Sequence, residues 1–167
     1  MLKEASRQVY ETFADGARDA IRALPSRPLK AVFPEHSSFR FYLWLRATCA
    51  NAVKRLVIVD AYMSADIFHR YLLNVPAGVP VVLVTIQGRS SEWPGFASVA
   101  KLYAQDHPLE IRHDPHLHER YVVQDEMAYS LTASIKDAAG KASCEVAPAA
   151  DAKYVEGLIT AAAVIQL

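Results

Sequence analysis

The sequence predicts an α/β fold in which a mixed, mainly parallel β-sheet carries helices on both faces. Short apolar runs rich in β-branched residues alternate along the chain with segments of helical periodicity. Strands separated by helices form βαβ units, whose strands run parallel and are buried on both sides. The length of 167 residues suits one compact core. We therefore expect a single domain over residues 1–167.

The first 50 residues predict a helix, a strand and a second helix. Residues 2–24 place apolar side chains at spacings of three, four and seven, with charged residues between them, which is typical of an amphipathic helix. Residues 1–24 are therefore expected to form an N-terminal helix, and prolines at positions 25 and 28 end it. A strand at 29–33 follows, and then a helix that Ser37 or Ser38 can cap and that extends to Cys49.

The remaining elements alternate between strands and helices. Apolar or alternating runs predict strands at residues 55–60, 79–86, 109–112, 121–123, 128–131 and 144–146. Helical patterns occupy residues 64–72, 94–105 and 151–162. The connections between the later strands are short, so we expect these strands to add antiparallel pairs.

Charge is balanced over the whole chain but not along it. The chain has 18 basic and 18 acidic residues. Residues 1–55 carry ten basic and five acidic groups, whereas residues 56–167 carry eight and thirteen. Zero net charge excludes indiscriminate coating of nucleic acid, which needs a large positive excess, but it leaves room for a local phosphate site.

Cysteine content and hydropathy predict a cytoplasmic protein without a membrane partner. Cys49 and Cys144 stand alone, with no CxxC pair, which is typical of the reducing cytosol. The longest apolar runs are too short to span a bilayer. No basic amphipathic surface points to binding on a membrane either.

Four histidines lie close together and allow two interpretations. His107, His113, His116 and His118 fall within twelve residues. In a strand, His116 and His118 would point to one face, as a metal site can require, with His113 or Asp114 nearby. No HExxH or CxxC motif is present to complete the ligands. The metal site is therefore the weaker interpretation.

The residues that follow favour a phosphodiester site. His118-x-Arg120 is followed after four residues by Asp125, and then by Ser134 in a run of small residues. This spacing resembles the HxKx4D signature of the phospholipase D superfamily. Residues 130–141 are similar to a GxSxKDxGxK stretch of many bacterial members, and Asp60-x-Tyr62 resembles their strand end. The resemblance covers residues 55–141 and indicates a bacterial, single-motif member with a degenerate HxR motif.

The resemblance implies the fold of one phospholipase D-like half and a metal-independent phosphoryl transfer without a cofactor. His118 would be the nucleophile or the general acid and base. Arg120 would replace the family's lysine and balance the phosphate charge. Asp125 would fix the local geometry, and the Ser134 hydroxyl would donate to a phosphate oxygen. Lys136 would complete the phosphate-binding set with Arg120 and Ser134.

Two functions remain open at this stage, because the family's complete active site uses two motifs and this chain has one. The first is a homodimeric phosphodiesterase, a nuclease by preference, with a phosphohistidine intermediate and the two His118 residues meeting at a twofold axis. The second is a catalytically degenerate module that binds nucleic acid, a phosphorylated ligand or a protein. Three positions depart from the family pattern and favour the second function. Arg120 stands where the family has lysine, Thr132 where it has glycine, and Lys136 where it has asparagine.

Simpler roles are open for the same residues. His118 can be a strand-edge histidine that bonds to Asp125 or Glu119. Arg120 can form an ion pair with either carboxylate. Asp60 can cap the helix that follows it, rather than lie at the rim of a ligand site with Tyr62.

Overall fold

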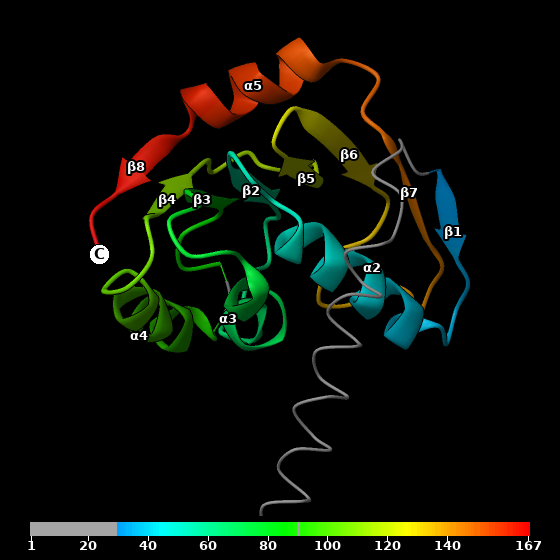
Figure 1. Cartoon of the computed structure of the whole chain (residues 1–167), viewed down its shortest axis with the longest axis horizontal. Helices are drawn as coiled ribbons and strands as arrows, with labels where there is room; N and C mark the ends of the chain where they lie inside the picture. Colours follow the sequence, from blue (N-terminus) through cyan, green and yellow to red (C-terminus); the bar gives the residue numbers. More distant parts are fainter. Residues whose placement is uncertain (1–29, 90) are drawn as a thin grey trace, which may run out of the picture.

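The computed structural model describes residues 30–89 and 91–167, and an eight-stranded mixed sheet forms its centre (Figure 1). In spatial order the strands are β1 (Ala31–Phe33), β7 (Cys144–Pro148), β6 (Met127–Leu131), β5 (Tyr121–Gln124), β2 (Leu56–Val59), β3 (Val81–Thr85), β4 (Leu109–His113) and β8 (Ala163–Ile165). The predicted strands therefore all lie in one sheet. The predicted N-terminal helix over residues 1–24 lies outside the described residues.

The α/β class and the mixed sheet are confirmed, but the sheet is mainly antiparallel rather than mainly parallel. Only the β2–β3 and β3–β4 pairs run parallel among the described strands. The other five pairings are antiparallel. Two residues join β5 to β6, and such a short turn can connect only antiparallel neighbours.

The strand β8 is an addition that the sequence analysis did not predict. The last predicted element is a helix over residues 151–162, and the structure has α5 at Ala152–Ala161. The chain then continues into β8, which pairs with β4 in antiparallel register and forms one edge of the sheet. Its three residues are apolar but largely exposed, so the sequence does not distinguish this strand from a continuation of the helix.

Three helices cover one face of the sheet. They are α2 (Ser38–Ala50), α3 (Asp66–Arg70) and α4 (Trp93–Tyr103), and a 3₁₀ turn at Leu72–Asn74 follows α3. Phe41, Phe68 and Phe96 come from these helices and share one buried cluster with Leu56 and Ile58 of β2. Ser37 precedes α2 but does not cap it, because its hydroxyl donates to the Pro34 carbonyl instead.

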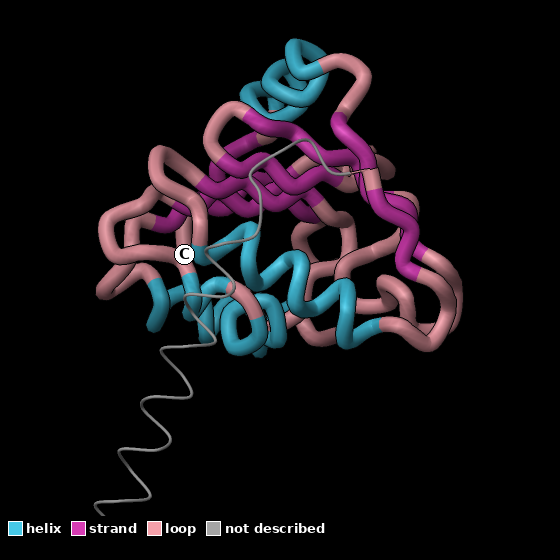
Figure 2. The backbone as a smooth tube through the Cα atoms, turned by 45° about the vertical axis from the view of Figure 1, so that its right-hand side comes forward, coloured by secondary structure: helices cyan, strands magenta, loops and turns pink. Residues whose placement is uncertain are grey.

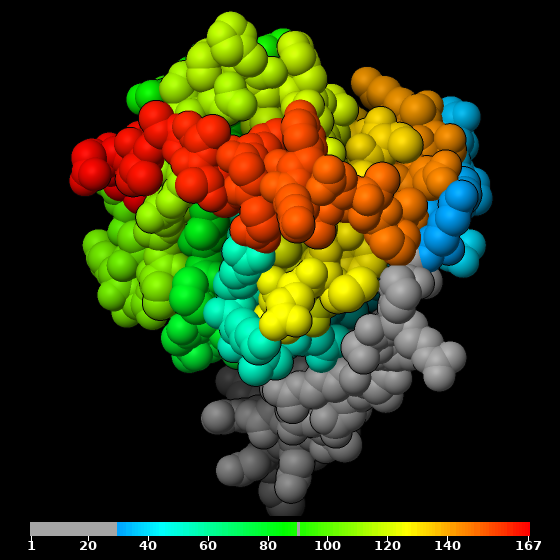
Figure 3. Space-filling model, turned by 90° about the horizontal axis from the view of Figure 1, so that it is seen from above, coloured from blue at the N-terminus to red at the C-terminus, as the bar shows by residue number. Residues whose placement is uncertain are grey.

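Helix α5 covers the opposite face, so the prediction of helices on both faces is confirmed (Figures 1 and 2). Val155 and Ile159 of α5 are buried with Val57 and Val59 of β2. Alternate residues of β2 thus belong to two different cores. The surface in Figure 3 shows α5 and β8 as one band across this face. No helix in the described part of the chain is long and apolar enough to cross a membrane.

Candidate functional site

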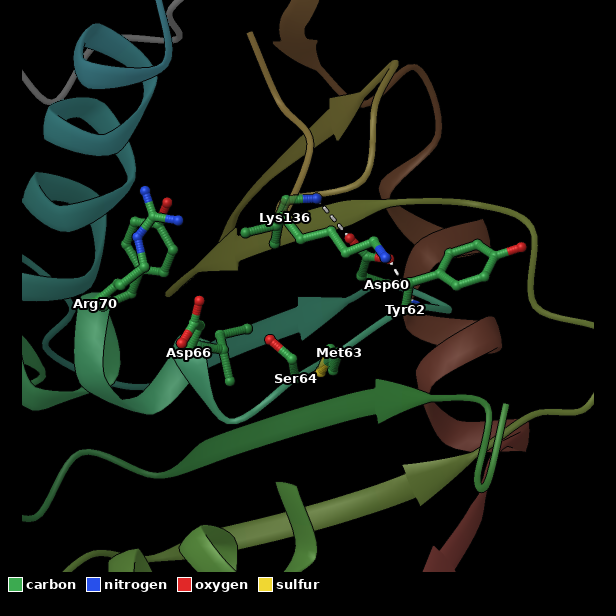
Figure 4. A pocket seen from close by; sticks show the side chains of 10 residues that line it. Asp60, Tyr62, Met63, Ser64, Asp66, Arg70 and Lys136 are labelled. Carbon is green, nitrogen blue, oxygen red and sulfur yellow. Dashed lines mark hydrogen bonds between the residues drawn. The ribbon is translucent and has the colours of Figure 1, made fainter. Parts of the chain in front are cut away.

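A buried carboxylate lies at the carboxyl end of β2. Asp60 is 1% exposed, and its two carboxylate oxygens accept the Ser134 hydroxyl at 3.1 and 2.9 Å. The same carboxylate accepts the backbone N–H of Ile135 at 2.7 Å and of Tyr62 at 2.9 Å. We call Asp60, Tyr62, Ser134 and Ile135 the Asp60 cluster. It joins β2 to the segment after β6, more than 70 residues later (Figure 4).

Local backbone geometry holds both halves of this cluster in place. The Asp60 N–H donates to the Val84 carbonyl and so extends the parallel pairing of β2 with β3 by one residue. After β6, the Asp137 N–H donates to the Ser134 carbonyl and closes a turn. That turn directs the Ser134 hydroxyl and the Ile135 N–H at one carboxylate. Asp60 does not cap α3, which excludes the simpler role considered for it.

Arg120 lies at the same end of the sheet. It directly precedes Tyr121, which pairs with Val59, the residue before Asp60. The Arg120 Nε is buried and has no hydrogen-bond partner among the described residues, while one terminal nitrogen donates to the His118 carbonyl at 3.5 Å. Arg120 forms no ion pair within the described residues, so its proposed pairing with Glu119 or Asp125 is absent there.

Two groups beside Arg120 have shifted pKa values. Burial raises the pKa of the Cys144 thiol, and the positive charge of Arg120 is among the influences that oppose this rise. The Tyr154 hydroxyl donates to Glu119 at 2.7 Å, and this bond holds the pKa of Glu119 below its usual value. Glu119 is therefore engaged by α5 and does not neutralise Arg120.

His118 is exposed on the connection between β4 and β5, and not in a strand as the metal interpretation requires. Its backbone N–H donates to Glu119 at 3.2 Å, but its imidazole makes no hydrogen bond within the described residues. The strand-edge role with a bonded imidazole is therefore not found. The described residues also contain no group of three or more histidine, cysteine, aspartate or glutamate side chains that could hold a metal ion.

Asp125 lies at the other end of the sheet from Arg120. It occupies the β5–β6 turn with a φ of 56°, and its Oδ1 accepts the backbone N–H groups of Val53, Lys54 and Arg55 at 3.0, 2.6 and 3.1 Å. The four residues of β5 separate it from Arg120, and the five residue steps span about 16 Å. The structure thus places Asp125 away from the candidate site, where it holds the segment that leads into β2.

Lys136 reaches the candidate site from the segment after Ser134. Its Nζ lies 5.6 Å from the centre of the Tyr62 ring, and the Arg89 guanidinium carbon lies 4.8 Å from the same ring. Arg89 also donates to the Tyr62 hydroxyl at 2.9 Å. Both cations therefore use the π face of Tyr62 and keep their charge available. Tyr62 was expected at the rim of a site, whereas Arg89 was not predicted from the sequence.

A pocket opens beside the Asp60 cluster, between the β2–α3 connection and Lys136 (Figure 4). It contains about 390 Å³ of empty space, part of which is open to solvent. Its polar lining residues include Ser64, Asp66, Arg70 and Lys136, and Met63, Ile67 and Ile135 supply apolar surface. Figure 4 shows Arg70 on one side and Lys136 with Tyr62 on the other.

Comparison with known proteins identifies the class of fold. No family model matches the sequence, and no curated protein matches it either. Solved structures of phospholipase D-like proteins do match in their folds. The chain therefore has a phospholipase D-like fold, as the motif resemblance implies.

Three solved structures match most of this chain. Nuc from Salmonella typhimurium, a phospholipase D family member, matches over 84% of this chain and 100% of its own, with a TM-score of 0.61 and 12% identity. NucT from Helicobacter pylori matches over 83% of this chain and 100% of its own, with a TM-score of 0.56 and 11% sequence identity. TrmBL2, an archaeal chromatin protein with a novel mode of DNA binding, matches over 97% of this chain, with a TM-score of 0.57 and 13% sequence identity. This chain spans 64% of the TrmBL2 chain.

The structure brings together some of the residues that the motif selects and adds others. Arg120, Ser134 and Lys136 lie at the carboxyl end of β2, and His118 lies on the connection leading to Arg120. Asp60 was considered only for a rim or a cap, although a charged residue directly after a fully apolar strand is a signal for a buried contact. Arg70 and Tyr71 also line the pocket but were not predicted from the sequence, since they look like ordinary residues of a short helix.

Proposed function

We propose that this chain is a phospholipase D-like module that binds the phosphate backbone of nucleic acid without cleaving it. The observation that carries the proposal is the hydrogen bond from Ser134 to the buried Asp60 carboxylate. A serine hydroxyl has one proton to donate. Because Asp60 accepts it, Ser134 cannot also stabilise a phosphate oxygen in the role that the motif implies.

The charge of Asp60 works against catalysis in the same place. A phosphodiester bound next to Ser134 would approach the Asp60 carboxylate, and like charges in a poorly solvated site repel strongly. Ile135 offers its N–H to the same carboxylate, so the local donors are already satisfied by an internal anion. Hydrolysis would require breaking the Asp60 cluster first.

Binding remains possible through cations around the cluster. Arg120, Lys136 and Arg89 lie at this end of the sheet, and none of them forms an ion pair within residues 30–89 and 91–167. Unpaired arginine and lysine side chains neutralise phosphates and release counterions, which gives salt-dependent affinity. The DNA binding described for TrmBL2 supports the proposal.

Removing the charge of Arg120 tests the binding proposal. Arg120→Gln is expected to weaken binding of a fluorescent 20-base-pair DNA by about tenfold, because one charge-assisted contact is lost. The slope of log affinity against log salt should fall by about one. Fluorescence anisotropy over a salt series measures both quantities.

Lys101→Gln is the matched control, because Lys101 is an exposed cation on α4 away from the Asp60 cluster. It should leave affinity and slope close to those of the wild type. Wild-type binding that does not depend on salt, or an equal loss in both variants, would contradict the proposal.

A second candidate function is a homodimeric phosphodiesterase that forms a phosphohistidine intermediate. The exposed imidazole of His118, without a hydrogen-bond partner in the described part of the chain, favours it. A second copy would have to bring its own His118 to the same phosphate, one attacking phosphorus and the other protonating the leaving oxygen. This candidate requires hydrolysis that is lost in His118→Ala.

A further inference from the structure

We propose that the pocket beside the Asp60 cluster binds a small organic anion, whose carboxylate or phosphate head lies between the Arg70 guanidinium and the Tyr71 hydroxyl. This ligand is additional to the nucleic-acid backbone proposed above and does not depend on it. Neither Arg70 nor Tyr71 belongs to the motif.

The Tyr71 hydroxyl is the first observation. Tyr71 lines the pocket and is only 2% exposed, yet its hydroxyl makes no hydrogen bond within the described residues. The side-chain polar atoms that are fully shielded from solvent and lack a partner in the described residues are His107 Nδ1 and Arg120 Nε, so the Tyr71 hydroxyl reaches solvent at the pocket wall. Its proton is therefore free to bond to a ligand. Burial raises the pKa of Tyr71 to about 12, so the hydroxyl keeps its proton at neutral pH. A ligand oxygen in the pocket can accept this proton.

The Arg70 guanidinium is the second observation. Its carbon lies 5.5 Å from the centre of the Tyr71 ring and 5.6 Å from that of Tyr42. These contacts orient the planar group without using its charge. Arg70 forms no ion pair in the described part of the chain, not even with Asp66, four residues earlier. The charges of Arg70 and Asp66 both influence the Tyr71 hydroxyl, which places it near the charged lining of the pocket.

The rest of the lining limits what the anion can be. Lys136 adds positive charge on the opposite side, whereas the exposed Asp66 disfavours a second anionic group beside it (Figure 4). The Ser64 hydroxyl can bond to a ligand hydroxyl, and Met63 and Ile135 provide an apolar wall. These features fit a small molecule with one charged head and a body that carries hydroxyl groups.

Titration calorimetry of the full chain with four compounds tests this inference. The compounds are glycerol 3-phosphate, glycerate, glycerol and inorganic phosphate. Glycerol 3-phosphate, glycerate or both should bind, and the stronger of the two identifies the head group. Glycerol should not bind, and inorganic phosphate should bind more weakly than the better of the two organic anions. If neither organic anion binds at millimolar concentration, or if glycerol binds equally well, the inference is wrong.

Variants assign any binding to this pocket. Tyr71→Phe keeps the ring but removes the hydroxyl and should weaken binding of the better anion at least tenfold, as should Arg70→Gln. Lys101→Gln should change nothing. Unchanged affinity in both pocket variants would overturn the assignment. Tyr71→Phe should retain wild-type DNA affinity, so failure of this inference can be distinguished from failure of the nucleic-acid proposal.

Discussion

Asp60→Ala is expected to lower the free energy of unfolding by about 3 kcal/mol, because three donors lose a charged acceptor. Ser134 is 7% exposed, so its hydroxyl cannot recover its hydrogen bond from bulk water. The Ile135 N–H, at 2.7 Å from the carboxylate, loses its acceptor in the same substitution. Urea denaturation followed by circular dichroism measures the loss.

Two further variants show whether the loss comes from these hydrogen bonds. Asp137→Ala removes an exposed carboxylate three residues after Ser134 and should change stability by less than about 0.5 kcal/mol. Asp60→Asn keeps the shape of the side chain, but its NH₂ group would replace an oxygen that accepts hydrogen bonds and would face their donors instead. Its loss of stability should therefore be similar to that of Asp60→Ala. A stable Asp60→Ala protein would show that the Asp60 cluster does not hold the two segments together.

Asp125→Ala is expected to cost about 2–3 kcal/mol of stability. The side chain accepts three consecutive backbone N–H groups, from Val53 to Arg55, and so fixes the entry to β2. Its φ of 56° adds to the cost, because alanine tolerates this left-handed conformation less well than aspartate does. Asp125→Asn retains an acceptor and the turn preference, and should lose less than alanine does.

The same residue gives a pH dependence. Burial raises the pKa of Asp125, but the backbone N–H groups of Lys54, Val53 and Arg55 outweigh it and leave the pKa below its usual value. A lowered pKa in the folded state means that this stabilisation is complete above the unfolded-state pKa, near 3.9, and is lost as pH falls through the folded value. Below about pH 4, the stability difference between wild type and Asp125→Ala should therefore narrow, and the part that comes from the positive φ should remain. A difference that stays constant down to pH 2 would contradict this role.

Local sequence pattern was sufficient for most of the fold, including the parallel β2–β3 and β3–β4 pairs and the antiparallel later pairs, but it overestimated the share of parallel pairs. The fully apolar run of β2 and the helices on each side follow from periodicity. Strand direction depends on how the chain returns to the sheet, and the two-residue turn at Asp125 alone makes β5 and β6 antiparallel. The strand β8 was missed because Ala163–Ile165 is short, exposed and continuous with a helix.

The candidate site was predictable only where a motif marks it. The spacing from Arg120 to Ser134 selects residues that the structure places at one end of the sheet. The same spacing also selects Asp125, which pairing of β5 with β2 carries to the other end. Motif spacing cannot show that Ser134 is already bonded to Asp60, since that contact spans 74 residues. Tyr71 carries no sequence signal, because only the three-dimensional structure shows that it lines the pocket.

Hydrolysis of a phosphodiester in the presence of EDTA tests the central claim most directly. The assay compares wild type with His118→Ala on bis(4-nitrophenyl) phosphate and on labelled DNA, at protein concentrations that saturate DNA binding. Because Asp60 engages the Ser134 hydroxyl, both proteins should bind DNA and show no turnover above the rate without protein. EDTA-resistant cleavage by the wild type that disappears in His118→Ala would contradict the account and establish the phosphodiesterase.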